Sequence, residues 1–205
     1  VQHGCAHDFG NSATLMLPWM EAIIAARLPR ESSALDALPK LRDMKIEDGW
    51  LGDTTTISNQ WATIASWSEF KGDRSRAAWL PNRAVAFVWR AWQTKDSPIV
   101  LEAATADGSI KLPPWSPKSS HDLMVNPGVA VQLDVKLSEG FALKNIQFFD
   151  GDQLLGEAAS APWQFLWQKP KPGAHSVHAV WQTDDGRDGA VNPALVVVRQ
   201  AQNEP

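Results

Sequence analysis

The stretch Ile146–Glu157, which reads IQFFDGDQLLGE, decides the fold of the second half of this chain. Apolar residues stand on both sides of the acidic triplet Asp150–Asp152. An Asp-Gly pair between two apolar runs is a strong signal for a tight β-hairpin turn, because glycine accepts the left-handed backbone that such turns need. The stretch therefore predicts two antiparallel strands joined at Gly151.

The residues around this hairpin also alternate with the period of a β-strand. Val129–Leu137, VAVQLDVKL, sets apolar side chains at every second position and predicts a half-buried strand. Trp163–Trp167, Val177–Trp181 and Leu195–Val198 add further short apolar runs. Short strands separated by Gly, Pro and Asp turns are typical of a β-sandwich. We expect a β-sandwich over 99–199, with no helix inside it.

The first part of the chain has a different pattern. A glycine-flanked loop around His7 precedes a predicted helix that ends near Leu28, with Asn11 or Ser12 as its cap and Pro18 at its first turn or at a kink. Residues 54–58 and 62–68 are rich in β-branched residues and predict short strands. A helix is expected over 83–92, because Pro81 and Asn82 stand before an apolar face at helical spacing.

These patterns divide the chain into two parts. The period changes from helical to strand-like after 94–98, a segment rich in polar residues that ends in Pro98. We therefore expect a first unit over 1–93, a linker over 94–98, a sandwich over 99–199 and a tail over 200–205. The predicted fold class is α+β.

Composition limits the classes of function. The chain has 205 residues, 44% of them hydrophobic, and a net charge of -4. These values are typical of a globular protein and argue against nucleic acid as the main partner. No apolar run reaches the length of a membrane span. Cys5 is the single cysteine, so it makes no internal disulfide.

Three motifs in the second half resemble the bacterial Ig-like repeat. These are the hairpin Ile146–Glu157, the strand APWQFLW over 161–167, and the strand GAHSVHAVW over 173–181. They occur in the order and spacing of that family, over about residues 98–199. The resemblance implies an immunoglobulin-like sandwich in a bacterial exported protein, secreted or periplasmic, where such modules serve as spacers or as accessories that contact glycans.

The first part resembles the C-terminal part of bacterial α/β-hydrolases of the esterase and dienelactone-hydrolase-like kind. The motifs are the loop with His7, the helix LPWMEAIIAARLP over 17–29, GWLGD over 49–53 and WLPN over 79–82. The resemblance implies a serine hydrolase acting on a small-molecule or glycan ester. His7 would be its catalytic residue, acting as general base and acid. No G-x-S-x-G motif occurs, so the nucleophile and the acid would precede Val1, and this truncated chain would be inactive alone.

Other interpretations of the same loop stay open. His7 could be a loop residue that bonds to nearby backbone, and Asp8 is more readily a solvated acid than its orienting partner. Cys5 could act as a nucleophile beside His7. His3 and His7 could bind a metal at i, i+4 spacing, but the glycines favour a loop and no third ligand is evident. We expect no metal and no cofactor.

The remaining polar clusters and the tryptophans are interpreted as structural rather than functional. The acidic turns 150–152 and 184–188 lack the spacing of a calcium loop and are interpreted as solvated turns. His175 and His178 fall on opposite faces of one strand, so they cannot share an ion. Lys71, Arg74 and Arg76 form a solvated turn. The 11 tryptophans, among them Trp163 and Trp167, are interpreted as core, with a carbohydrate-stacking surface as the alternative.

Two functions from different classes follow. The first is the hydrolase part described above, and the alternative is a non-catalytic Ig-like spacer or a module that binds carbohydrate or a surface. Residues 1–93 alone are expected to be poorly stable, since Ile23, Ile24, Val85 and Trp89 would face a sheet that is absent. Residues 98–199 are expected to fold independently.

Overall fold

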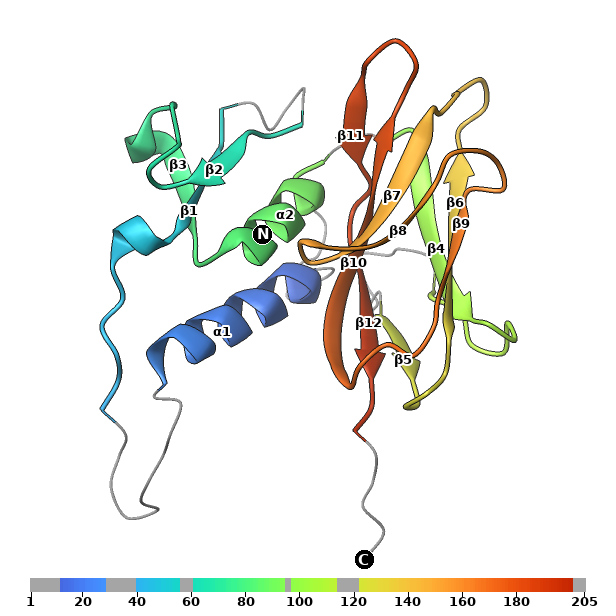
Figure 1. Cartoon of the computed structure of the whole chain (residues 1–205), viewed down its shortest axis with the longest axis horizontal. Coiled ribbons are helices and arrows are strands. Elements are labelled where there is room, and N and C mark those ends of the chain that lie inside the picture. Colours follow the sequence, from blue (N-terminus) through green and yellow to red (C-terminus); the bar gives the residue numbers. More distant parts are fainter. Residues whose placement is uncertain (1–11, 29–39, 56–60, 95–96, 114–121, 201–205) are drawn as a thin grey trace, which may run out of the picture.

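A computed structural model describes residues 12–28, 40–55, 61–94, 97–113 and 122–200. Its elements fall into a helical part and a sandwich part that lie side by side (Figure 1). In chain order the elements are α1 (Ala13–Arg27), η2 (Ile46–Asp48), β1 (Trp50–Asp53), β2 (Ile64–Ser66), η3 (Arg74–Arg76), β3 (Ala77–Leu80), α2 (Arg83–Trp92), β4 (Ile99–Thr105), β5 (Asp122–Val125), β6 (Val131–Leu137), β7 (Asn145–Asp150), β8 (Gln153–Ala158), β9 (Gln164–Trp167), β10 (Gly173–Gln182), β11 (Asp188–Ala190) and β12 (Ala194–Val198).

The second half is a β-sandwich, as the sequence predicts. One sheet has the order β5-β12-β10-β7-β8 with β11 paired to β10, and the facing sheet has the order β4-β6-β9. All pairs are antiparallel except β12 with β5. The hairpin β7–β8 turns at Gly151, whose φ of 58° is the left-handed conformation that the Asp-Gly signal requires. Among the described residues of 99–199 there is no helix, which confirms that prediction.

The sandwich core comes from the inward-facing residues of both sheets. Strand β6 contributes Val131, Leu133 and Val135, the alternation expected from the sequence. Across the core, Phe148 of β7 is fully buried and its ring stacks on Phe165 at 5.9 Å between centroids. Each strand therefore turns one face into a shared apolar interior.

The helical part has its own small core. Its sheet has the order β2-β1-β3 and is antiparallel throughout. Helix α2 lies on this sheet, and Trp89 packs against Gly52 so closely that a Cβ there would lie 2.3 Å from the indole. Val85 and Trp89 are 1% and 5% exposed. The expectation that their faces lack a sheet is wrong, because β1–β3 supplies one.

Local signals explain the ends of the helices. The Asn82 side chain accepts a hydrogen bond from Val85 N at 2.9 Å, so α2 begins as predicted. Helix α1 ends at Arg27, and Pro18 lies inside it. Ser12 makes no side-chain cap, and Asn11 lies outside the described residues. The cap prediction is therefore wrong for Ser12.

The short strands are displaced from their predicted positions. Strand β1 covers 50–53 rather than 54–58, because the Asp53 carboxylate accepts a bond from Thr55 N and turns the chain there. Residues 56–60 lie outside the described residues. Strand β2 is shorter than the predicted 62–68. Of the described residues, none supports the α/β-hydrolase expectation, since the sheet of the helical part is antiparallel.

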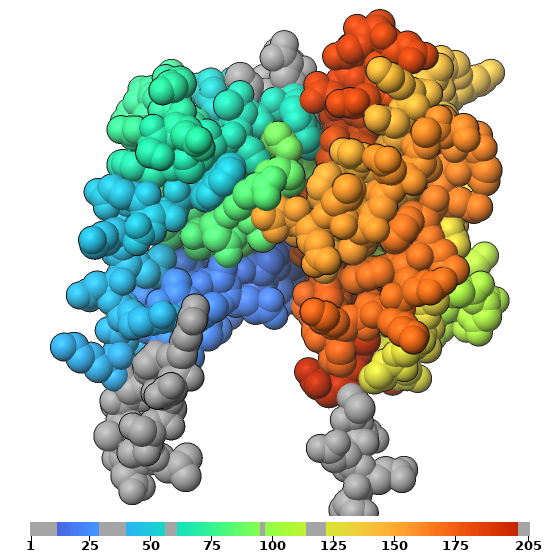
Figure 2. Space-filling view, viewed as in Figure 1, coloured from blue at the N-terminus to red at the C-terminus, as the bar shows by residue number. Residues whose placement is uncertain are grey.

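Helices α1 and α2 pack against the outer face of the larger sandwich sheet at β10 and β12. In Figure 1 they lie against β10, and Figure 2 shows the two parts in continuous contact. Strand β10 is therefore buried on both faces along 176–179, whereas the sequence predicts one buried face. This surface, where α1 and α2 meet β7, β10, β11 and β12, is called the joint below.

Candidate functional site: the joint between the helices and the sandwich

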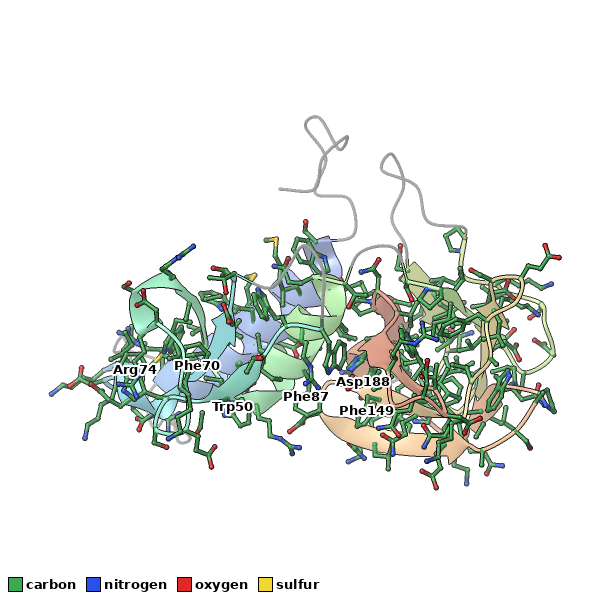
Figure 3. The ribbon with its side chains drawn as sticks, turned by 90° about the horizontal axis from the view of Figure 1, so that it is seen from above. Trp50, Phe70, Arg74, Phe87, Phe149 and Asp188 are labelled. Carbon is green, nitrogen blue, oxygen red and sulfur yellow. The ribbon has the colours of Figure 1, made fainter. Side chains whose placement is uncertain are left out.

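The joint centres on His178, which β10 directs away from the sandwich core. The strand alternates, so Val177 and Ala179 point into the core and His178 points toward the helices. Its imidazole is 0% exposed and stacks on Phe149 of β7, with centroids 5.6 Å apart and an interplanar angle of 13°. Phe149 in turn contacts Phe87 of α2, with ring centroids 6.0 Å apart (Figure 3). The histidine thus stacks on an aromatic ring of the sandwich that itself contacts an aromatic ring of α2.

Neither ring nitrogen of His178 has a hydrogen-bond partner among the described residues. Burial and the positive charge of Arg90 together lower the pKa of His178 to about 4, against smaller contributions from the Ser176 backbone and Asp150. The imidazole is therefore neutral at pH 7. Burying a polar ring without a hydrogen-bond partner costs free energy because the ring loses its hydration, so its presence in the joint calls for an explanation.

Arg90 of α2 brings a positive charge into the same region. Its guanidinium lies 3.9 Å from the centre of the Trp61 ring and 4.9 Å from that of Phe87, the geometry of cation–π contacts. Burial lowers the pKa of Arg90 to about 10, while the carboxylate of Asp188 in β11 acts in the opposite direction. The side chain stays charged at pH 7 and is held between two aromatic rings.

Polar bonds tie the helices to the sandwich at both ends of the joint. Asn192, in the loop before β12, directs its amide nitrogen to the carbonyls of Ala91, Trp92 and Thr94, at 3.2, 3.2 and 3.0 Å. Trp92 is the last residue of α2, and a helix leaves its final carbonyls without partners within the helix. At α1, Ser176 Oγ donates to the carbonyl of Thr14. Arg83 and Asp152 add an exposed ion pair at 3.3 Å.

A second histidine lies on the opposite face of β10. His175 Nδ1 is 2.7 Å from Asp150 Oδ2, and its Nε2 is 2.8 Å from the Lys171 carbonyl. Burial lowers the pKa of His175, but the bond and charge of Asp150, with Lys171 and Glu21, outweigh it and raise the pKa overall. Two acceptors suit an imidazolium, which donates from both nitrogens. The prediction that His175 and His178 lie on opposite faces is confirmed.

The other predicted polar residues fall into three groups. The loop residues His3, Cys5, His7 and Asp8 lie outside the described residues, so their predicted roles stay predictions. In the turn 184–188, Arg187 Nε bonds to Asp185 Oδ2 at 2.9 Å. In the basic turn, the guanidinium of Arg74 lies 4.9 Å from the centre of the Trp67 ring. The described residues contain no group of three or more side chains placed to hold a metal ion.

Trp163 and Trp167 pack against the sandwich core, which supports the core interpretation. A groove of about 770 Å³ runs beside β4, with Glu102, Lys111 and Asp134 at its polar side. In the part of the chain that the structure describes, no helix is long and apolar enough to cross a membrane.

Sequence reasoning missed the joint because its residues carry ordinary signals. His178 alternates with apolar neighbours, which indicates a solvent-facing position, and Arg90 on a helix indicates a solvated side chain. One available signal was the apolar content of the outer face, where Phe149, Leu195 and Val197 occupy outward positions. Such a face needs a cover.

Comparison with known proteins adds little to this picture. No family model matches the chain, and no curated protein matches it. Fibronectin(III)-like modules of Clostridium thermocellum CbhA are similar at 21% identity, over 37% of this chain and 84% of theirs, with a TM-score of 0.35. A lytic polysaccharide monooxygenase from Jonesia denitrificans is similar at 20% identity, over 42% of this chain and 59% of that one, with a TM-score of 0.31. The β-sandwich assignment therefore rests on the strand pairings themselves.

Proposed function

We propose that this chain is a non-catalytic spacer module of an exported protein, in which the helices and the sandwich hold a fixed orientation. The observation that carries the proposal is the bonding of Asn192 to the last turn of α2, beside the segment 94–98. A flexible connection would leave the carbonyl of Trp92, the last residue of α2, to water. The ring of Phe149, which is tilted against Phe87 and stacked on His178, supports the same conclusion.

A spin-label distance measurement tests the spacer proposal. Labels on cysteines introduced at the exposed positions Lys71 and Glu139, with Cys5→Ser, report the separation of the two parts. At pH 7 we expect one narrow distance distribution. Adding Asn192→Ala removes the ties to α2 and should broaden it, whereas Asn126→Ala, at an exposed asparagine outside the joint, should not. A broad distribution in the parent protein at pH 7 would refute a fixed spacer.

The hydrolase hypothesis remains a separate proposal about His7. If its nucleophile and acid precede Val1, this chain alone should hydrolyse p-nitrophenyl acetate no faster than buffer. His7→Ala should then change nothing. Turnover that His7→Ala abolishes would show that the chain holds a complete active site, and would contradict the non-catalytic proposal.

Carbohydrate binding is a second candidate, favoured by the groove beside β4. Its volume is within the range of small-ligand sites, and it combines an apolar wall with the polar side chains of Glu102, Lys111 and Asp134. Titration with cello-oligosaccharides, followed by amide NMR, should shift resonances of β4 and β6. Shifts scattered over both parts, or none, would reject this candidate.

A further inference from the structure

His178 lies where a change of its charge would act directly on the contact between the two parts. The residue comes from the sandwich, but one side of its environment is built by α2. Its ring is fully buried and stacked on Phe149, and no described residue offers a bond to either nitrogen. A protonated ring would lose its hydration, and the backbone of Ser176 offsets only a smaller part of that cost.

The charged groups around the ring do not compensate for such a proton. Arg90 of α2 is positive and repels an imidazolium. On β7, the carboxylate of Asp150 is already bonded to His175, on the other face of β10. Asp188 of β11 acts on Arg90. The Ser176 backbone and Asp150 favour the charged form of His178, and each contributes less than burial or Arg90.

Two further carboxylates near the joint interact with groups other than His178. Asp152 pairs with Arg83 at the exposed rim, and Glu21 of α1 acts on His175. His175 has its pKa raised and keeps its two acceptors, so it remains protonated as the pH falls below 6.5. In that range it does not oppose the effect of His178.

We propose that His178 makes the docking of the helices on the sandwich acid-sensitive, so that protonation of its ring releases α1 and α2 from β10. The sandwich core itself has no part in this step, because Val177 and Ala179 face the other way. The release would leave the sandwich folded and would free the outer face of its larger sheet. This inference rests on the spacer function, whose rigidity it places under the control of pH.

The pH range follows from the linkage between protonation and docking. The folded pKa of His178 is depressed to about 4 from 6.5, so its contribution is fully present above pH 6.5 and is lost as the pH falls toward 4. If the released ring has its ordinary pKa, the docking equilibrium weakens about 30-fold at pH 5 and about 150-fold at pH 4. A weakening of this size is enough to undock helices that are held by a docking free energy of a few kcal/mol.

The same pair of spin labels, at Lys71 and Glu139, tests the inference at pH 7 and at pH 4.5. We expect a narrow distribution at pH 7 and a broad one at pH 4.5. His178→Phe, which keeps an aromatic ring but cannot be protonated, should remain narrow at both values. His178→Leu serves as a second variant in case the larger ring disturbs packing. Far-UV circular dichroism and the methyl NMR signals of Leu133 and Val177 should show that the sandwich stays folded at pH 4.5.

The outcomes separate this inference from the spacer proposal. A distribution that is narrow at both pH values overturns the acid response and leaves the spacer intact. One that is already broad at pH 7 overturns the spacer. Broadening at pH 4.5 that persists in both His178 variants assigns the response to another group and overturns the inference. Loss of the methyl signals of the sandwich at pH 4.5 also overturns it, because the response would then be global unfolding.

Discussion

Phe148→Ala should lower the free energy of unfolding by about 3–5 kcal/mol, the usual cost of removing a buried phenylalanine ring. Phe148 is 0% exposed and lies between the two sandwich sheets. Its ring stacks on Phe165, which in turn lies over Gly156, where a Cβ would be 2.2 Å from the ring. With no side chain at that glycine to move into the space, the cavity would stay largely unfilled. Urea unfolding followed by circular dichroism measures the loss.

Two control variants make this prediction specific. Phe148→Leu keeps most of the volume and should cost clearly less than the alanine variant. Leu154→Ala removes an apolar side chain from the adjacent strand β8, but that residue is 48% exposed, so we expect a change within about 1 kcal/mol. Equal losses for Phe148→Ala and Leu154→Ala would mean that the core does not lie between these sheets.

Trp89→Ala should lower the free energy of unfolding of the helical part by a similar amount, about 3–5 kcal/mol. Trp89 is buried in the cluster formed by α2 and the sheet β2-β1-β3, and its indole fills the space above Gly52. Trp19→Ala is the matched control, since Trp19 lies on α1 and is 38% exposed. Because 11 tryptophans contribute to fluorescence, helix unfolding is best followed by circular dichroism.

A double-mutant cycle tests the contact between Trp89 and Gly52. Gly52→Ala alone should cost about 1–3 kcal/mol, because its new methyl group meets the indole. In the Trp89→Ala background the methyl group has room, so the same substitution should cost much less. Additive losses in the cycle would show that the indole does not lie over Gly52.

The sequence predicts those elements whose local pattern agrees with their surroundings. The hairpin at Gly151, strand β6 and helix α2 were predictable because each has one apolar face and a turn or cap residue at its end. The sequence places this strand at 54–58 because the β-branched residues lie there, whereas β1 covers 50–53. The strand ends at an Asx turn at Asp53, which depends on one side-chain bond. Propensity alone does not locate such a bond.

The joint could not be predicted because it depends on contacts between distant parts of the chain. Periodicity places His178 on the outer face of β10 but does not say that α2 covers that face. In the same way, Ile24 was expected to face a sheet that is absent and is 49% exposed, whereas Thr14, a polar residue and the second of α1, is fully buried. Which face of α1 is covered is set by its position on β10.

The docking of the helices on the sandwich is tested most directly by ¹⁵N relaxation of the backbone amides at pH 7. If the joint is a fixed contact, amides of α1, α2 and β1–β3 share one rotational correlation time with those of β6 and β10. A distinctly shorter correlation time for the helical part would show that it moves independently of the sandwich. That result would contradict the account of the joint given above.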